Sequence, residues 1–257
     1  MFKRVNGRIF NIVSVGSGEP PLLLIGGWIG SWQLWRQPME LLSAHRRCVA
    51  YDHRGAGQTI AATQDLHPEG LVDDVFLLLD ALGIDRCWLA GESQGGIIAV
   101  MAAVRAPSRF LGLTLIATAP AFAQTAEHDQ FAAALERNPD SVLRRFVDLC
   151  IPEADSGHLK RWLLHILKEA EPGAGVSLVR QMYRADIRNQ LAAVSLPTQI
   201  IHGEADRIET PAGAATLARG IRNAELLLLP GVGHVPTITC PEIVAQAMAS
   251  FMARHQA

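Results

Sequence analysis

The chain alternates short runs of hydrophobic residues with longer stretches in which hydrophobic residues recur every three or four positions. The short runs predict buried strands, and the three-to-four spacing predicts amphipathic helices. Alternation of the two is typical of βαβ units built around a mostly parallel sheet. The expected strands cover residues 8–15, 21–25, 47–51, 87–90, 111–116, 198–201 and 225–229.

Two of the expected helices follow strands in the first half of the chain. Residues 71–82 form one, with Gly83 placed to end it. Residues 94–105 form the other, and this helix is hydrophobic nearly all round, which predicts that it is buried in the centre of the molecule. A last amphipathic helix is expected to have Ile243 and Phe251 on its apolar side.

Between residues 121 and 191 the alternation stops, and only helical segments are expected. One of them is predicted to begin at an N-cap formed by Asp140 and Ser141. Helices inserted into a βα alternation are expected to lie over the carboxyl edge of the sheet, where open α/β sheets bind ligands. We therefore predict a catalytic core of residues 1–120 and 192–257, with residues 121–191 as an inserted helical cap.

Composition and charge narrow the function classes. The chain is 49% hydrophobic and 19% charged, with a net charge of −2, which argues against a disordered protein and gives no electrostatic footprint for nucleic acid or an anionic membrane. No segment approaches the roughly 20 apolar residues of a membrane span, and no signal peptide is recognised. The four cysteines are scattered without a CxxC pair. A cytoplasmic protein without a nucleic-acid or membrane partner is expected.

The segment Gly-Glu-Ser-Gln-Gly at residues 91–95 is the strongest chemical signal in the chain. It matches the G-x-S-x-G pattern and lies between an expected strand and an expected helix, which is the context that this motif requires. Small residues on both sides of Ser93 permit a tight turn, which raises the serine above the sheet edge at a helix N-terminus. Ser93 is therefore the candidate nucleophile.

A serine hydroxyl needs a base to accept its proton and an acid to orient that base. Among nine histidines, His234 is the candidate base, because it lies in a glycine-containing loop between an expected strand and the last helix. Asp206 is the candidate acid, with Glu204 and Glu209 as rivals in the same loop. The order of Ser93, Asp206 and His234 along the chain is that of the α/β-hydrolase fold.

An oxyanion requires two preorganised hydrogen-bond donors. One is expected to be the backbone N–H of Gln94, directly after the nucleophile. The other is expected in the loop after the strand at residues 21–25, and we choose the backbone N–H of Trp28, since Gly26 and Gly27 let the chain turn sharply. The alternative is that these two glycines merely turn the chain.

Together these segments resemble the α/β-hydrolase fold family, in particular bacterial esterases and lactonases with a helical cap. The likeness covers nearly the whole chain, and its motifs are Gly26-Gly27, Asp52-x-Arg54-Gly55-x-Gly57, the turn at Ser93, Gly203-x-x-Asp206, and Gly233-His234 with Pro236. The resemblance implies an α/β fold with a mostly parallel central sheet flanked by helices. It also implies that Ser93 separates this chain from epoxide hydrolases and haloalkane dehalogenases, which use aspartate at this position.

Two positions depart from the family pattern. Relatives usually carry histidine where this chain has Gly26, so the hydrogen bonds that support the oxyanion loop are expected to differ. Many relatives also carry glutamate where this chain has Thr239. Neither departure removes a member of the expected triad.

The leading hypothesis is a serine hydrolase that cleaves a small carboxylic ester or lactone through an acyl-enzyme intermediate. The same triad would also serve a carbon–carbon bond hydrolase of the meta-cleavage-product type, or a thioesterase. A non-catalytic ligand-binding protein on this scaffold is a third hypothesis. Fold-level analogy does not decide among these.

The sequence has no metal-ligand cluster and no dinucleotide motif, so no cofactor is expected. The expected partner is the small substrate, and a homodimer is compatible with the sequence. The insertion is expected to roof Ser93 and set specificity, with Phe122, Phe131, Phe146, Trp162 and Tyr183 as its aromatic residues. Near the oxyanion loop, Trp28, Trp32 and Trp35 either wall an apolar pocket or, for the last two, pack in the core.

Overall fold

The centre of the molecule is a twisted, mostly parallel sheet. The structure, a computed structural model, describes residues 1–59, 61, 65–121, 126–171, 173–182 and 185–255, and only the backbone at 126–128. Within these ranges the sheet has eight strands in the order β1-β2-β4-β3-β5-β6-β7-β8. They are β1 (Phe2–Val5), β2 (Arg8–Val15), β3 (Leu22–Ile25), β4 (Cys48–Tyr51), β5 (Cys87–Glu92), β6 (Phe110–Ile116), β7 (Thr198–Gly203) and β8 (Ala224–Leu229). β2 pairs antiparallel with β1 and β4, and the strands from β4 to β8 pair in parallel.

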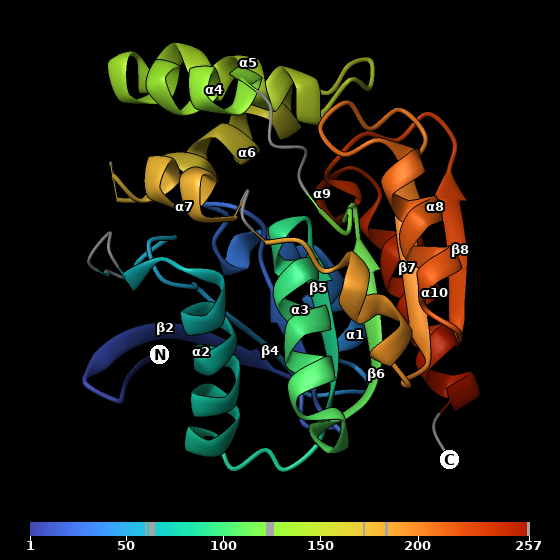
Figure 1. Cartoon of the computed structure of the whole chain (residues 1–257). Coiled ribbons are helices and arrows are strands. Elements are labelled where there is room, and N and C mark those ends of the chain that lie inside the picture. Colours follow the sequence, from blue (N-terminus) through green and yellow to red (C-terminus); the bar gives the residue numbers. More distant parts are fainter. Residues whose placement is uncertain (60, 62–64, 122–125, 172, 183–184, 256–257) are drawn as a thin grey trace.

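Helices cover both faces of this sheet (Figure 1). The α-helices are α1 (Arg36–Leu42), α2 (Pro68–Ala81), α3 (Gln94–Arg105), α4 (Ala126–Arg137), α5 (Pro139–Cys150), α6 (Gly157–Lys168), α7 (Ala174–Met182), α8 (Pro211–Gly220), α9 (Pro236–Thr239) and α10 (Pro241–His255). The described 3-10 helices include η1 (Trp32–Trp35), η3 (Pro107–Arg109) and η4 (Arg188–Ala193). α2, α3 and α8 lie on one face, and α1 and α10 pack together on the other (Figure 1).

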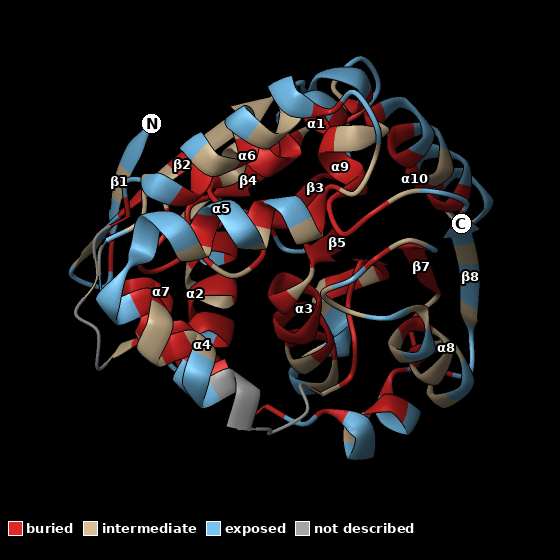
Figure 2. Cartoon of the chain, turned by 90° about the horizontal axis from the view of Figure 1, so that it is seen from above, coloured by how far each residue is buried: buried red, intermediate tan, exposed pale blue. Residues whose placement is uncertain are grey.

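The presence of helices on both faces of the sheet explains why its central strands are hydrophobic. Every residue of β3, β4, β5 and β7 is buried, as is usual for parallel strands between two helical layers. Figure 2 shows the same buried centre from above, surrounded by helices with exposed outer faces. The predicted fold class, an α/β protein with a mostly parallel sheet flanked by helices, is confirmed.

The helices α4 to α7 gather over the end of the sheet at which β5 stops (Figures 1 and 2). They occupy the segment in which only helices were expected, and an isolated antiparallel bridge joins Ala121 to Asp186 near its two ends. The proposed division into a core and a cap, at residues 121 and 191, stays a prediction.

Three local expectations were wrong or incomplete. β1 was not predicted, because Phe2 is exposed at the sheet edge and the strand has no apolar run; Asn6 and Gly7, both at positive φ, turn it into β2. α5 begins earlier than expected, because Asn138 caps it by accepting from the Ser141 amide at 3.3 Å. Ile243 is 49% exposed, so the apolar side of α10 is the one with Val244, Met248 and Phe251.

Candidate active site

Ser93 lies on a strained turn between β5 and α3. Its φ is 53° and its ψ is −120°, a conformation that residues with a side chain rarely adopt. The flanking glycines are required, since a Cβ on Gly91 would lie 2.2 Å from the carbonyl oxygen of Gly95, and one on Gly95 would lie 2.5 Å from that of Ile25. The turn presents the hydroxyl above the central strand and at a helix N-terminus.

Three predicted side chains, far apart in the sequence, meet at this turn. Ser93 Oγ lies 3.1 Å from Nε2 of His234, and Nδ1 of His234 lies 2.8 Å from Oδ2 of Asp206. Asp206 follows β7 and His234 follows β8, so both lie at the carboxyl end of the sheet, as Ser93 does. A hydroxyl, an imidazole and a carboxylate bonded in series can activate the oxygen as a nucleophile.

The acid bonded to the imidazole is Asp206 rather than either glutamate of its loop. Glu204 is exposed. Glu209 contacts Asp206 through its backbone amide, which donates to Oδ1 at 3.0 Å. Burial, and then repulsion by Asp206, raises the pKa of the Glu209 carboxyl to about 8.

Asp206 is ionised at neutral pH. Burial works to raise its pKa, but attraction to His234 and hydrogen bonds from His202, His234 and the Ile208 amide outweigh burial and hold the pKa well below its ordinary value. The Ile208 amide donates to Oδ1 at 2.8 Å, and Nε2 of His202 lies 3.2 Å from Oδ2. The carboxylate is therefore able to stabilise a positively charged imidazole.

The loop after β3 passes directly over Ser93, the candidate nucleophile. A Cβ on Gly27 would lie 3.2 Å from the Cβ of Ser93, so glycine permits this close approach. The N–H of Trp28 belongs to the next peptide unit of that loop, and the N–H of Gln94 is at the first residue of α3, where helix amides have no partner within the helix. These are the two amides expected to bind an oxyanion.

A cavity of about 30 Å³ adjoins Ser93. Loops of the core line it on one side, and the cap helices α5 and α6 line it on the other. The lining residues include Trp28, Leu34, Phe146, Cys150, Leu163, Leu167 and Val235. Because one water needs about 10–15 Å³ by this measure, the space holds about two. The walls are mainly apolar, which suits an uncharged group.

The aromatic residues divide between this cavity and the core. The Trp28 ring lies 5.6 Å from that of Phe131 and 5.1 Å from that of Phe146, and its Nε1 donates to the Gly175 carbonyl at 2.9 Å. Trp35 is fully buried in the core. Phe122 and Tyr183, two of the aromatic residues expected to shape the roof, lie outside the described residues.

The predicted cap, residues 121–191, is also hydrogen-bonded to the loop that contains the candidate base. The Gly233 amide donates to Oε1 of Glu153 at 2.9 Å, and the His234 amide donates to the carbonyl of Cys150 at 2.8 Å. Cys150 ends α5 and Glu153 follows it. The sequence contained no signal for these contacts, because both acceptors lie some 80 residues before the loop.

Glu92, directly before Ser93, is a second buried carboxyl, and it lies in the wall of the cavity beside Ser93. It is 1% exposed, its Oε1 accepts from Thr237 at 2.5 Å, and its Oε2 has no hydrogen-bond partner among the described residues. Burial, with repulsion by Asp206 and against the Thr237 hydrogen bond, raises the pKa of Glu92 to about 8. The group is therefore mostly protonated at neutral pH.

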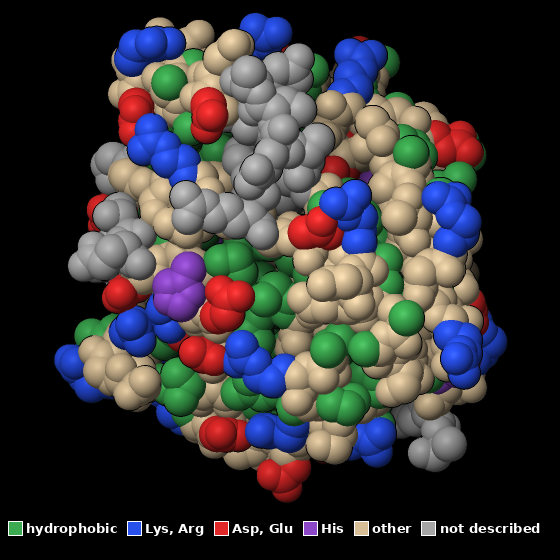
Figure 3. Space-filling view, in the orientation of Figure 1, with side chains coloured by type: hydrophobic (Ala, Val, Ile, Leu, Met, Phe, Trp, Pro, Cys, Tyr) green, Lys and Arg blue, Asp and Glu red, His purple; other side chains and the backbone are tan. Residues whose placement is uncertain are grey.

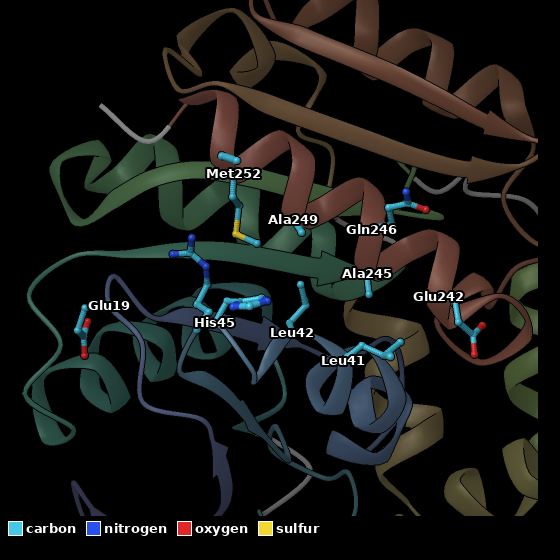
Figure 4. A pocket seen from close by; sticks show the side chains of 11 residues that line it. Glu19, Leu41, Leu42, His45, Glu242, Ala245, Gln246, Ala249 and Met252 are labelled. Carbon is cyan, nitrogen blue, oxygen red and sulfur yellow. The ribbon is translucent and has the colours of Figure 1, made fainter.

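A larger cavity of about 540 Å³ lies between α1 and α10 (Figure 4). Leu41 and Leu42 of α1 face Ala245 and Met252 of α10 across it. Its lining includes no triad residue and no residue of the cavity beside Ser93. Size alone therefore does not make it a reaction site.

Three observations concern the described surface, the described helices and the described polar side chains. On the face in Figure 3, positive and negative side chains are interspersed rather than gathered by sign. Over the described ranges, no helix has the length and hydrophobicity needed to cross a bilayer. Among the described residues, no three His, Cys, Asp or Glu side chains are clustered so that they could hold a metal ion.

A serine on a strained strand-to-helix turn, at the centre of a mostly parallel sheet, is the architecture on which α/β hydrolases present their nucleophile. The family model described as the alpha/beta hydrolase fold matches residues 20–172, more than half of the chain. The chain belongs to the α/β-hydrolase fold family.

The similar proteins include enzymes and a receptor. The chain is 30% identical over 246 residues to a pimeloyl-[acyl-carrier protein] methyl ester esterase of Nitrosomonas europaea, covering 90% of this chain and 95% of the relative. It is 25% identical over 251 residues to the karrikin insensitive 2 receptor IA of Petunia hybrida, covering 92% and 91%. Its fold matches the solved enol-lactonase of Burkholderia xenovorans LB400 with a TM-score of 0.92 and 24% identity, over 98% of this chain and 100% of the other.

Proposed function

We propose that this protein is a serine hydrolase that cleaves a small carboxylic ester or lactone through an acyl-enzyme intermediate. The observation that supports this most directly is the 3.1 Å contact between Ser93 Oγ and Nε2 of His234 on the strained turn. At this distance the imidazole is able to accept the hydroxyl proton. The similarity to a methyl ester esterase supports the same bond type.

In the first half-reaction, Ser93 Oγ attacks the carbonyl carbon while Nε2 of His234 takes the hydroxyl proton. The carbonyl oxygen becomes an oxyanion, which the amides of Trp28 and Gln94 bind. The bond to the leaving oxygen then breaks, and the imidazolium returns the proton to it. Asp206 stabilises the imidazolium throughout by accepting from Nδ1 at 2.8 Å.

The second half-reaction releases the acyl group. Water gives a proton to His234 and attacks the acyl carbon, so the oxyanion forms again at the same two amides. The bond to Ser93 Oγ breaks and the serine recovers its proton from His234. The products are a carboxylic acid and an alcohol, or a single hydroxy acid when the substrate is a lactone.

We assign selection of the acyl group to the cap, residues 121–191. The support is that Phe146, Leu163 and Leu167 contribute apolar walls to the cavity beside Ser93. A cavity with room for about two waters fits a short acyl group, and its apolar walls disfavour a charged one.

Labelling with a fluorophosphonate probe tests the proposed nucleophile. The probe is expected to attach to Ser93 in the wild type, and Ser93→Ala is expected to abolish both labelling and ester turnover while keeping the unfolding temperature. Ser195→Ala, at an exposed serine far along the chain, is the matched control and is expected to label fully. Labelling elsewhere, or none, overturns the proposal.

A substrate panel then ranks the reactions available to this triad. Aryl esters and lactones are expected to react faster than acyl thioesters and vinylogous diketones, and the reverse order contradicts the ester assignment. The similarity to a receptor of this fold supports one alternative. Saturable binding of a small apolar ligand without turnover is the outcome that favours it.

A further inference from the structure

The peptide unit between Gly27 and Trp28 is held from its carbonyl side. Its N–H, on Trp28, is one of the two proposed oxyanion donors. Its carbonyl oxygen, on Gly27, accepts from the Gly30 amide at 3.0 Å and lies 2.9 Å from Nε2 of His53. A histidine from a different loop, the one that follows β4, therefore contacts the same peptide that faces the nucleophile.

His53 is suited to hold this peptide in place. It is 2% exposed, and its other ring nitrogen, Nδ1, lies 3.0 Å from the carbonyl oxygen of Arg54. Both contacts are to carbonyl oxygens, which only accept, so each is a hydrogen bond only when that ring nitrogen carries a proton; the contact with Gly27 is one when the proton is on Nε2. Burial of the ring, with backbone atoms close to both nitrogens, restricts its rotation.

We propose that His53 is a positioning residue for the oxyanion site: by donating from Nε2 to the Gly27 carbonyl, it keeps the Trp28 N–H aimed at the oxygen that develops charge beside Ser93. This inference rests on the proposed function. In a planar trans peptide the C=O and N–H bonds point in opposite directions. Fixing the oxygen on one side therefore fixes the direction of the N–H on the other.

The need for such a restraint comes from the glycines of this loop. Glycine adopts backbone angles closed to other residues, so a segment with Gly26 and Gly27 is able to rotate a peptide unit at low steric cost. Rotation of the 27–28 peptide would turn a carbonyl oxygen toward the oxyanion and break its bonds to Gly30 and His53. A hydrogen bond to the carbonyl also polarises the unit and strengthens its N–H as a donor.

Two amide substitutions separate positioning from general stability. The longer side chain of His53→Gln is able to reach the Gly27 carbonyl with an N–H, whereas the side chain of His53→Asn is one carbon shorter. His53→Asn is expected to lower kcat for an aryl ester by roughly 10- to 100-fold with KM changed less than about threefold, below the loss of 10²–10³ for deleting a donor outright. His53→Gln is expected to recover most of that loss.

Affinity for a trifluoromethyl ketone gives a second readout that a purely structural role would not move. The bound ketone forms a tetrahedral oxyanion on Ser93, so its affinity is expected to fall in His53→Asn by the same factor as kcat/KM. Thr59→Val, at a buried threonine of the same loop whose Oγ1 accepts from the Asn11 amide at 3.0 Å, is the control. It is expected to lower the unfolding temperature without changing kcat or ketone affinity.

The outcomes distinguish this inference from the proposed function. A wild-type protein without ester turnover and without labelling at Ser93 overturns the proposed function itself. An active wild type in which His53→Asn and His53→Gln have equal kcat overturns only the role of His53. The same holds if His53→Asn loses no more kcat than Thr59→Val does, or if only its KM changes. If His53→Asn does not fold, the comparison of His53→Gln with His53→Leu replaces it, with the same expected order.

Discussion

Glu92 combines two properties that rarely occur together in a side chain. It is the last residue of the buried strand β5, and its side chain is almost wholly enclosed. One of its carboxyl oxygens accepts from Thr237, while the other has no hydrogen-bond partner among the described residues. Enclosure favours the protonated form, which has no charge to desolvate. The chain therefore holds a neutral acid beside Ser93 and an ionised one, Asp206, bonded to His234.

The raised pKa of Glu92 predicts a measurable pH dependence of stability. Its pKa is about 8 in the folded protein against an ordinary 4.5, so between these values the unfolded chain binds fewer protons and the free energy of unfolding falls as pH rises. Glu92→Gln stays neutral and keeps an oxygen for Thr237. The variant is therefore expected to lack the part of the fall that Glu92 causes. At pH 8 its free energy of unfolding is expected to exceed that of the wild type by up to a few kcal/mol, since one pKa unit corresponds to about 1.4 kcal/mol.

Urea unfolding at pH 5 and pH 8 measures this effect. Glu204→Gln, at an exposed carboxyl, is the control and is expected to unfold with the wild-type pH dependence. If the free energy of unfolding changes between pH 5 and pH 8 by the same amount in Glu92→Gln as in the wild type, Glu92 ionises in the folded protein with its ordinary pKa.

At the scale of single residues, the sequence was most informative where a motif limits the backbone. Ser93, His234 and Asp206 were predicted together, and the structure brings them within hydrogen-bond distance, although their catalytic role stays a proposal. Glu153 and His53 were not predicted. Each contacts a backbone atom that is distant in the sequence, and neither hydrophobic periodicity nor residue spacing reports such a contact.

At the scale of elements, the cap helix α5 contributes one aromatic side chain to the wall of the cavity beside Ser93. Phe146 is half-buried, packs on the Trp28 ring and lines the space beside Ser93. Phe146→Ala is expected to enlarge that space and shift preference from acetate esters toward butanoate and hexanoate esters. Each buried methylene is worth about 0.8 kcal/mol, which corresponds to roughly fourfold in kcat/KM.

The ratio of kcat/KM for hexanoate and acetate esters of one alcohol measures that shift. Val142→Ala lies one helical turn earlier on α5, at a half-buried position outside the cavity lining, and is expected to leave the ratio unchanged. Equal ratios in Phe146→Ala and the wild type would mean that the acyl chain binds elsewhere.

The predicted elements agreed with the structure where burial dictates the pattern. The central strands and α3 were predicted because both faces of the sheet are covered, which imposes unbroken hydrophobic runs. The misplaced start of α5 has a different origin. Asn138 and Asp140 are both good N-cap residues by type, and Pro139, which suits the first helical position, favours the earlier one.

At the scale of the whole molecule, three carboxyl groups near the candidate active site predict the pH at which stability is greatest. The lowered pKa of Asp206 contributes stability that is present above its unfolded pKa, near 3.9, and is lost as pH falls below it. The raised pKa values of Glu92 and Glu209, both about 8, make stability fall as pH rises from about 4.5. The maximum is therefore expected near pH 5, on the acid side of neutrality.

Thermal unfolding between pH 3 and pH 9 locates that maximum. In a variant with both Glu92→Gln and Glu209→Gln, the maximum is expected to move toward neutral pH, because the two groups that erode stability above pH 4.5 no longer ionise. A wild-type maximum at pH 7 or above would contradict the assignment. Asp206→Asn is expected to remove part of the decline below pH 4.

The hydrogen bonds that the Gly233 and His234 amides donate to Glu153 and Cys150 tie the position of the candidate base to the cap. A roof that swung open at that end would pull the histidine away from Ser93 each time it moved. The cap is also bonded to the core elsewhere, where Nε1 of Trp28 donates to the Gly175 carbonyl and Nε2 of Gln33 donates to Oε2 of Glu169, so opening at any of these points breaks at least one hydrogen bond. An opening that keeps the bonds at Gly233 and His234 leaves the contacts of His234 with Ser93 and Asp206 assembled.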